Sequence, residues 1–238
     1  MPYSKIEIPQ PREMFIRQIE DQIISGKLSV GEKLPTEREL EAETGIKQSV
    51  IHYALKDLEH MGFVTIRPRQ GVYVADYMKN GSIDTLNELL RYNGYRLTLK
   101  MGTELVELRN GIEGAALIRL AAEHTPEQLE ELRASVSELR EMSGGEHSTT
   151  ELADVAKKFH YLICDLCGND IIPLVMNAFS PLSNQVWKMC VRFWGVDGFV
   201  AHDEKILELI EAGKGHEAQS YLEEIFGQYL DANKELMK

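Results

Sequence analysis

Hydrogen-bonding side chains recur near residue 50 at the spacing of one helix face. Gln48 and His52 are four residues apart, and Ile51, Leu55 and Leu58 form an apolar stripe on the opposite side of the same segment. The outer face carries Lys47, Gln48, Ser49, His52 and Tyr53. Amide, imidazole and hydroxyl groups in such a row can bind base edges in the major groove, and lysine can bind phosphates. This pattern predicts a DNA-binding helix; an ordinary solvated face is the alternative.

A second polar group lies between two β-rich runs, "FVTIR" and "GVYVA", which predict a hairpin. Arg67, Arg69 and Gln70 lie at or beside its tip, where they can reach a minor groove or a phosphate. Arg38 lies on a short helix opened by a capping box of Thr36 and Glu39, and it is a further candidate for a DNA contact. A plain hairpin and a plain surface helix would also fit these positions.

The net charge of −12 argues at first against nucleic acid, because phosphate binding usually leaves a basic surface. The charge is unevenly spread, however. Residues 1–78 hold 10 Lys and Arg against 12 Asp and Glu, whereas the remainder holds 16 against 26. Most of the acidity therefore falls outside the candidate DNA-binding segment, and the total charge does not exclude DNA.

The elements that must position these residues follow in a recognisable order. A helix starts behind Pro11 and stops at Gly26, the capped helix begins after Thr36, and Gly45 separates it from the helix that carries Gln48. With the hairpin, this predicts a winged helix-turn-helix domain over residues 1–78. The polar stretch "DYMKNGSI" is the expected linker. Residues 79–238 have helical periodicity almost throughout and predict an all-α bundle of six or seven helices, so the fold class is mainly α.

Composition limits the remaining possibilities. The three cysteines do not make a disulfide framework, and Cys164 and Cys167 lie in a helical pattern that favours a reduced, structural role. No apolar run approaches the length of a membrane span. The start "MPYSKIEIPQPREM" lacks the apolar core of a secretory signal, so we expect a cytoplasmic protein with no membrane partner. No cofactor motif is present.

Segments in both parts of the chain resemble a known family. The segments "ISGKLSVGEKLPTERELEAETGI" and "ALKDLEHMGFVTIRPRQGVYV" resemble the DNA-binding domain of the GntR family of bacterial transcription regulators. The segments "LVELRNGIEGAALIRLAAEHTPEQLEEL", "FHYLICDLCGN" and "ILELIEAGKGHEA" are similar to its FadR-like branch, which carries an FCD effector domain. The resemblance implies a homodimer that binds a palindromic double-stranded DNA operator and responds to a small molecule in the C-terminal domain.

The resemblance also implies where an effector would bind, and the chain departs from the family there. Many relatives hold a divalent metal through an Asp and a His one turn apart, plus two further His. Here His160 matches the first His, but the other positions carry Ala156, Asp203 and Ile225. Two possible ligands are too few for zinc or nickel, so we expect no metal site. His160 and Asp203 are expected to form a buried pair that faces the pocket.

Arg109 matches an arginine that relatives direct into the ligand cavity. It predicts an anionic effector, such as an organic acid or an acyl-coenzyme A, because buried arginines seek carboxylates or phosphates. An internal ion pair with Glu113, four residues on, is an equal alternative. Further candidates for effector contacts are Asn184, Trp187 and Arg192.

Two other functions remain open from the sequence. The first is a constitutive DNA-binding dimer whose pocket has lost its ligand. The second is an enzyme that uses His160, Asp203 and Arg109. No nucleophile motif or phosphate loop supports an enzyme, so no catalytic residue is expected.

Overall fold

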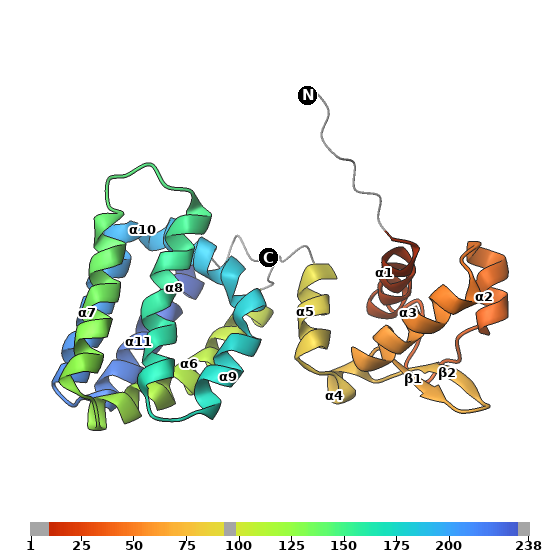
Figure 1. The fold of residues 1–238 in the computed structure, drawn as a ribbon, viewed down its shortest axis with the longest axis horizontal. Helices are drawn as coiled ribbons and strands as arrows, with labels where there is room; N and C mark the ends of the chain where they lie inside the picture. The colour runs from red at the N-terminus through yellow and green to blue at the C-terminus, as the bar shows by residue number, and fades with distance from the viewer. Residues whose placement is uncertain (1–9, 93–98, 233–238) are drawn as a thin grey trace. The chain divides into compact units, whose positions relative to one another are not determined.

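The computed structural model describes residues 10–92 and 99–232. Its chain separates into two compact units, residues 1–94 and residues 95–238 (Figure 1). The sheet of the described residues is a single two-stranded hairpin in the first unit, and the rest of the regular structure is helical. The expected fold class, a winged helix-turn-helix followed by an all-α domain, is confirmed.

The first unit has the predicted order of elements. It contains α1 (Pro11–Ile24), α2 (Glu37–Thr44), α3 (Gln48–His60), β1 (Val64–Arg67) and β2 (Gly71–Val74). Thr36 and Glu39 form the capping box that starts α2, and Gly45 ends it with a φ of 70°, a conformation that glycine adopts without strain. Ile51, Leu55 and Leu58 are buried with α1, so α3 is fixed with its polar face outward.

The hairpin forms the expected wing. β1 and β2 pair antiparallel, with Val64 opposite Val74 and Arg67 opposite Gly71. The three-residue turn between them contains Arg69 at a φ of 62°, the left-handed region that residues other than glycine seldom occupy. The wing therefore projects Arg69 and Gln70 from a strained, exposed turn, and Arg67 lies beside them at the end of β1.

The expected linker has a different structure. Residues 77–80 form the short helix α4 (Tyr77–Asn80), and α5 (Ile83–Tyr92) follows at once. The Thr85 hydroxyl donates a hydrogen bond to the Met61 carbonyl, and Arg91 lies 2.6 Å from the buried Glu20 of α1. These contacts attach α5 to the winged helix. The described part of the first unit consequently includes α5, which lies beyond the expected boundary at residue 78.

The second unit is the expected helical bundle. Its described residues form α6 (Leu99–Ala122), α7 (Pro126–Glu141), α8 (Thr149–Leu166), α9 (Ile171–Ala178), α10 (Ser180–Glu211) and α11 (Gly215–Ala232). Capping boxes at Thr125 and Ser148 start α7 and α8. Gly195, at a φ of 67°, kinks α10 into two segments, so the bundle has six or seven helices according to how α10 is counted. A Cβ on Gly215 would lie 2.5 Å from the Ile118 Cα, so only glycine allows α11 to begin against α6.

The bundle core also holds all three cysteines of the chain. Cys164, Cys167 and Cys190 are buried, free thiols, and burial raises the pKa of the Cys164 and Cys190 thiols. In the described part of the chain no helix combines the length and apolar character that crossing a membrane requires. Residues 1–9, which bear on the expected lack of a secretory signal, lie outside the described residues.

Candidate functional site

The outer face of α3 presents the side chains that the sequence singled out. Lys47, Gln48, Ser49, His52 and Tyr53 are all exposed, as is Arg38 on α2. Tyr53 is 61% exposed, a large value for an aromatic side chain with no role in the core. No side chain caps the N-terminus of α3, so its first N–H groups are available to a phosphate. This face brings hydrogen-bonding, basic and aromatic groups together over a fixed helix.

Two glutamates of α2 contact this face, and sequence reasoning missed them. The Gln48 Nε2 donates a hydrogen bond to the Glu41 carboxylate over 2.5 Å, and the His52 Nδ1 lies 2.8 Å from the Glu37 carboxylate. Glu37 and Glu41 are four residues apart on α2, and Gln48 and His52 are four residues apart on α3. The two contacts therefore lie one helical turn apart between these helices. A carboxylate only accepts hydrogen bonds, so the Gln48 Nε2, and not the Gln48 Oε1, must face Glu41. For the same reason Glu37 favours the form of His52 that carries a proton on Nδ1.

The wing places its basic residues at the surface. Arg67, Arg69 and Gln70 are exposed, and the Arg67 guanidinium lies 4.4 Å from the centre of the Tyr73 ring. This stacking holds Arg67 against the hairpin, whereas Arg69 lies at the turn. The wing therefore offers one supported and one projecting arginine for phosphate or minor-groove contacts.

The second unit contains a cavity of about 50 Å³ between α6, α8, α9, α10 and α11. Its walls are mostly apolar, and Arg109 is the one charged residue that lines it within the described part of the chain. The lining residues are Leu105, Val106, Leu108, Arg109, Ile112, Tyr161, Met176, Phe179, Ser183, Val186, Trp187 and Phe226. Leu108 is 45% exposed, so one wall reaches the protein surface. The cavity can admit a small, mainly apolar molecule.

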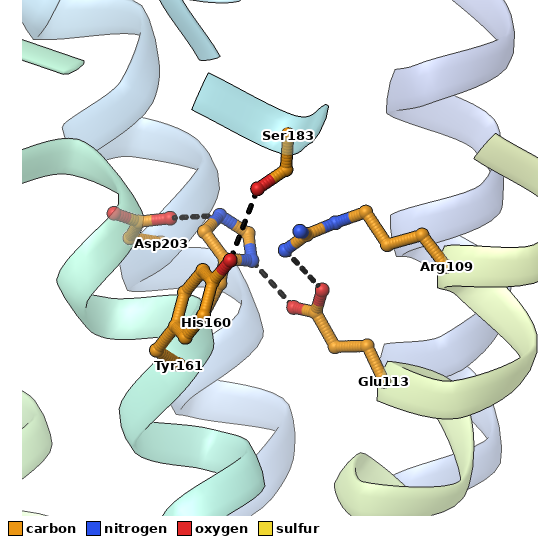
Figure 2. Close-up of polar contacts among 6 residues, drawn as sticks. All are labelled: Arg109, Glu113, His160, Tyr161, Ser183 and Asp203. Carbon is orange, nitrogen blue, oxygen red and sulfur yellow. Dashed lines mark hydrogen bonds and ion pairs between the residues drawn. The ribbon is translucent and has the colours of Figure 1, made fainter. Parts of the chain in front are cut away.

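A chain of buried ionisable groups continues behind Arg109 (Figure 2). The Arg109 guanidinium lies 2.5 Å from one oxygen of Glu113, and the other oxygen lies 2.5 Å from the His160 Nδ1. The His160 Nε2 faces Asp203 over 3.4 Å, a longer contact than a typical hydrogen bond. The internal ion pair of Arg109 and Glu113 and the buried proximity of His160 and Asp203 are thus both present. Neither His160 nor Asp203 lines the cavity.

Burial and charge set the protonation of the two carboxyl groups in opposite ways. Burial acts to raise the pKa of Glu113, but Arg109 and His160 outweigh it and hold that pKa below its usual value. Burial raises the pKa of Asp203 well above its ordinary value, and the Glu113 charge raises it further. Glu113 is therefore ionised, whereas Asp203 favours its neutral form, in which the carboxyl proton can face the His160 Nε2.

Arg109 is also held by aromatic contacts. Its guanidinium carbon lies 4.3 Å from the Trp187 ring centre and 5.8 Å from that of Phe226. The Arg109 Nε and the Trp187 Nε1 are buried and find no hydrogen-bond partner among the described residues. The arginine is consequently fixed at the cavity wall with one charge partner and one unsatisfied donor.

The other effector candidates are placed differently. Asn184 is half-buried and accepts a hydrogen bond from the Lys157 ammonium over 3.0 Å, and Arg192 is exposed; neither lines the cavity. Trp187 lines it with only 1% of its surface exposed. Arg192 was expected near the effector, but its position on α10 turns it toward the surface of the bundle.

The residues at the family's metal positions do not fit a metal ion. Ala156 and Ile225 lie in the apolar core and offer no donor atom. Each ring nitrogen of His160 already faces a carboxyl group. Within residues 10–92 and 99–232, no group of three His, Cys, Asp or Glu side chains is arranged to hold a metal. The site is instead a protein-internal charge cluster beside an apolar cavity.

Comparisons with known proteins agree with this architecture. The family model "Bacterial regulatory proteins, gntR family" matches residues 11–74, and the model "FCD domain" matches residues 104–228. The HTH-type transcriptional regulator Mce2R of Mycobacterium tuberculosis is 31% identical over 176 residues, which cover 71% of this chain and 68% of that protein. The fatty acid metabolism regulator protein of Shewanella frigidimarina is 23% identical over 178 residues, covering 74% and 70% of the two chains.

A solved structure extends the likeness to almost the full length. The Listeria monocytogenes protein Lar, described as controlling the expression of the agr system, matches with a TM-score of 0.58 and 18% identity, over 95% of this chain and 97% of that one. At this identity the likeness shows the fold alone. The two family models and the Mycobacterium tuberculosis relative decide the assignment. The chain belongs to the GntR family of bacterial regulators, with a DNA-binding winged helix-turn-helix followed by an FCD domain.

Proposed function

We propose that the protein is a homodimeric transcription regulator that binds a palindromic operator and responds to a small molecule in the cavity of its second unit. The observation that carries the proposal is the exposed polar face of α3, fixed over a buried core and flanked by a basic wing. A two-fold dimer presents two such faces to two half-sites, which explains the need for a palindrome. The place of action is then the cytoplasm, where the operator lies.

The cavity supports the regulatory part of the proposal. It is lined by five helices, so a bound molecule can bias their arrangement. The sequence left Arg109 with two roles, recognition of an anion and an internal ion pair. The contact with Glu113 over 2.5 Å supports the second role.

The alternative functions have less support. An enzyme that uses His160, Asp203 and Arg109 would need its substrate to reach all three, but the first two lie behind the cavity wall. A constitutive DNA-binding dimer remains the main competitor, because it needs no ligand in the cavity.

Selection from a random duplex DNA library with the full-length protein tests the proposal. We expect enrichment of an inverted repeat, and light scattering should give twice the mass of one chain. Lys47→Ala should weaken binding to the selected site, whereas Lys205→Ala, which removes an exposed lysine from the second unit, should not. An enriched site without two-fold symmetry, or equal effects of the two substitutions, would contradict it.

A further inference from the structure

The His52 ring is held in a defined orientation on the exposed face of α3. Its Nδ1 lies 2.8 Å from the carboxylate of Glu37 on α2, the helix that packs against α3 (Figure 1). On α3 itself the ring meets that of Tyr53 edge-on, with 5.9 Å between the ring centres. The Arg12 guanidinium lies 5.8 Å from the Tyr53 ring centre and donates two hydrogen bonds of 2.6 Å to Asp57, so Tyr53 is supported as well. The imidazole is therefore oriented before DNA binds.

The contact with Glu37 determines which ring nitrogen of His52 carries the proton. A carboxylate only accepts hydrogen bonds, so the Nδ1 must be the donor, and a neutral imidazole then has its Nε2 as an acceptor. Both side chains are accessible to water, which screens the Glu37 charge, so an exposed ring of this kind is neutral in mildly alkaline solution. No hydrogen bond to this Nε2 is formed within residues 10–92 and 99–232, and 52% of the side chain is exposed. The acceptor is thus open to DNA.

An acceptor at this position has few partners on duplex DNA. Phosphate oxygens are themselves acceptors, so a neutral Nε2 cannot bind them. The donors in the major groove are the N6 amino group of adenine and the N4 amino group of cytosine, whereas guanine and thymine present acceptors there. A lysine or arginine would have the opposite preference, because its side chain only donates.

From these contacts we infer that Glu37 is a positioning residue that makes His52 read an adenine or a cytosine of the operator. The inference rests on the proposed DNA-binding function. It gives a residue of α2 a part in base selection, through its hydrogen bond to a side chain of α3.

Selection from a random duplex library at about pH 8, with full-length wild type and His52→Arg, identifies the base that faces residue 52. The position whose preference differs between the two proteins is that base. Wild type should select adenine or cytosine there. His52→Arg should select guanine, because the guanine O6 and N7 both accept hydrogen bonds.

Competition between duplexes that differ only at that base pair then tests Glu37. Wild type should prefer its selected base over guanine by about fivefold, the selectivity expected of one hydrogen bond, and Glu37→Ala should lower this to about twofold or less. Glu37→Gln should keep the preference, because the amide oxygen accepts from the Nδ1. Glu43→Ala is the matched control, because it removes an exposed negative charge from the same helix, and it should behave as wild type.

The outcomes separate this inference from the proposed function. A guanine or thymine selected by wild type at that base, or no position that changes in His52→Arg, would overturn the reading role of His52. Unchanged preference in Glu37→Ala, or an equal loss in Glu37→Gln or Glu43→Ala, would overturn the positioning role of Glu37. If Glu37→Ala does not fold, Glu37→Lys takes its place, because lysine only donates and should also abolish the preference. If the library yields no enriched sequence, the proposed DNA-binding function fails and the inference falls with it.

Discussion

Removing the Glu41 carboxylate should separate base selectivity from affinity in the DNA complex. In the structure, the Gln48 Nε2 donates to Glu41 over 2.5 Å, which orients the amide and leaves its oxygen and second N–H for a base. That set matches the N6 donor and N7 acceptor of adenine, so we expect adenine at the base facing Gln48. In Glu41→Ala the amide can turn over and present its groups in the wrong order.

The size of the effect follows from the exposure of the contact. Both side chains lie at the protein surface, where a polar pair contributes up to about 1 kcal/mol. Preference for adenine over guanine at that base should therefore fall by about fivefold, a part of the roughly 1–3 kcal/mol that a good bidentate contact supplies. Total affinity should stay the same or rise, because a negative charge leaves the DNA-binding face.

Competition between two operator duplexes that differ only at that base pair measures the selectivity, and titration of each gives the affinity. Glu41→Gln is the matched control, because it removes the charge but keeps an oxygen that accepts from Gln48. It should retain the adenine preference. Unchanged selectivity in Glu41→Ala, or equal losses in both variants, would refute a positioning role for Glu41.

Three further predictions concern stability and phosphate binding. Burial and Glu88 raise the pKa of Glu20 to about 6 despite Arg91, so the folded state holds this proton more tightly than the unfolded state. The free energy of unfolding of the first unit should therefore fall by about 2 kcal/mol as the pH rises from about 4.5 to beyond 6. In calorimetric scans Glu20→Gln should abolish that fall. Thr36→Ala removes the α2 cap and should destabilise the same unit by about 1 kcal/mol in urea denaturation. Arg69→Gly should relieve about 1 kcal/mol of left-handed strain, seen as a higher melting temperature, while the salt dependence of operator binding becomes shallower by about one phosphate contact. A steeper or unchanged salt dependence would remove Arg69 from the interface.

The sequence predicted the elements better than the contacts between them. The capping box at Thr36, the break at Gly45 and the hairpin depend on residues a few positions apart, so local pattern is sufficient. The attachment of α5 was missed because "DYMKNGSI" is polar and resembles a linker, whereas the helix that follows it is held by the distant partners Met61 and Glu20.

The same limit applies to the candidate sites. Helical spacing correctly suggested that Glu113 can reach Arg109, a contact within one helix. It could not show that the other Glu113 oxygen meets His160 on α8, or that Glu37 and Glu41 of α2 contact side chains of α3. Contacts between helices depend on the packing angle and on side-chain rotamers, and the spacing of residues within one segment predicts neither of them.

The buried cysteines provide a way to measure how often the second unit opens locally. Cys164, Cys167 and Cys190 all lie in the second unit, and a thiol must become exposed and ionised before an alkylating reagent attacks it. The labelling rate of the native protein consequently reports how often the effector bundle opens, with no signal from the winged helix. A molecule that occupies the cavity will slow that rate in proportion to how firmly it closes the bundle, so ligands can be ranked by reaction time before any operator sequence is known.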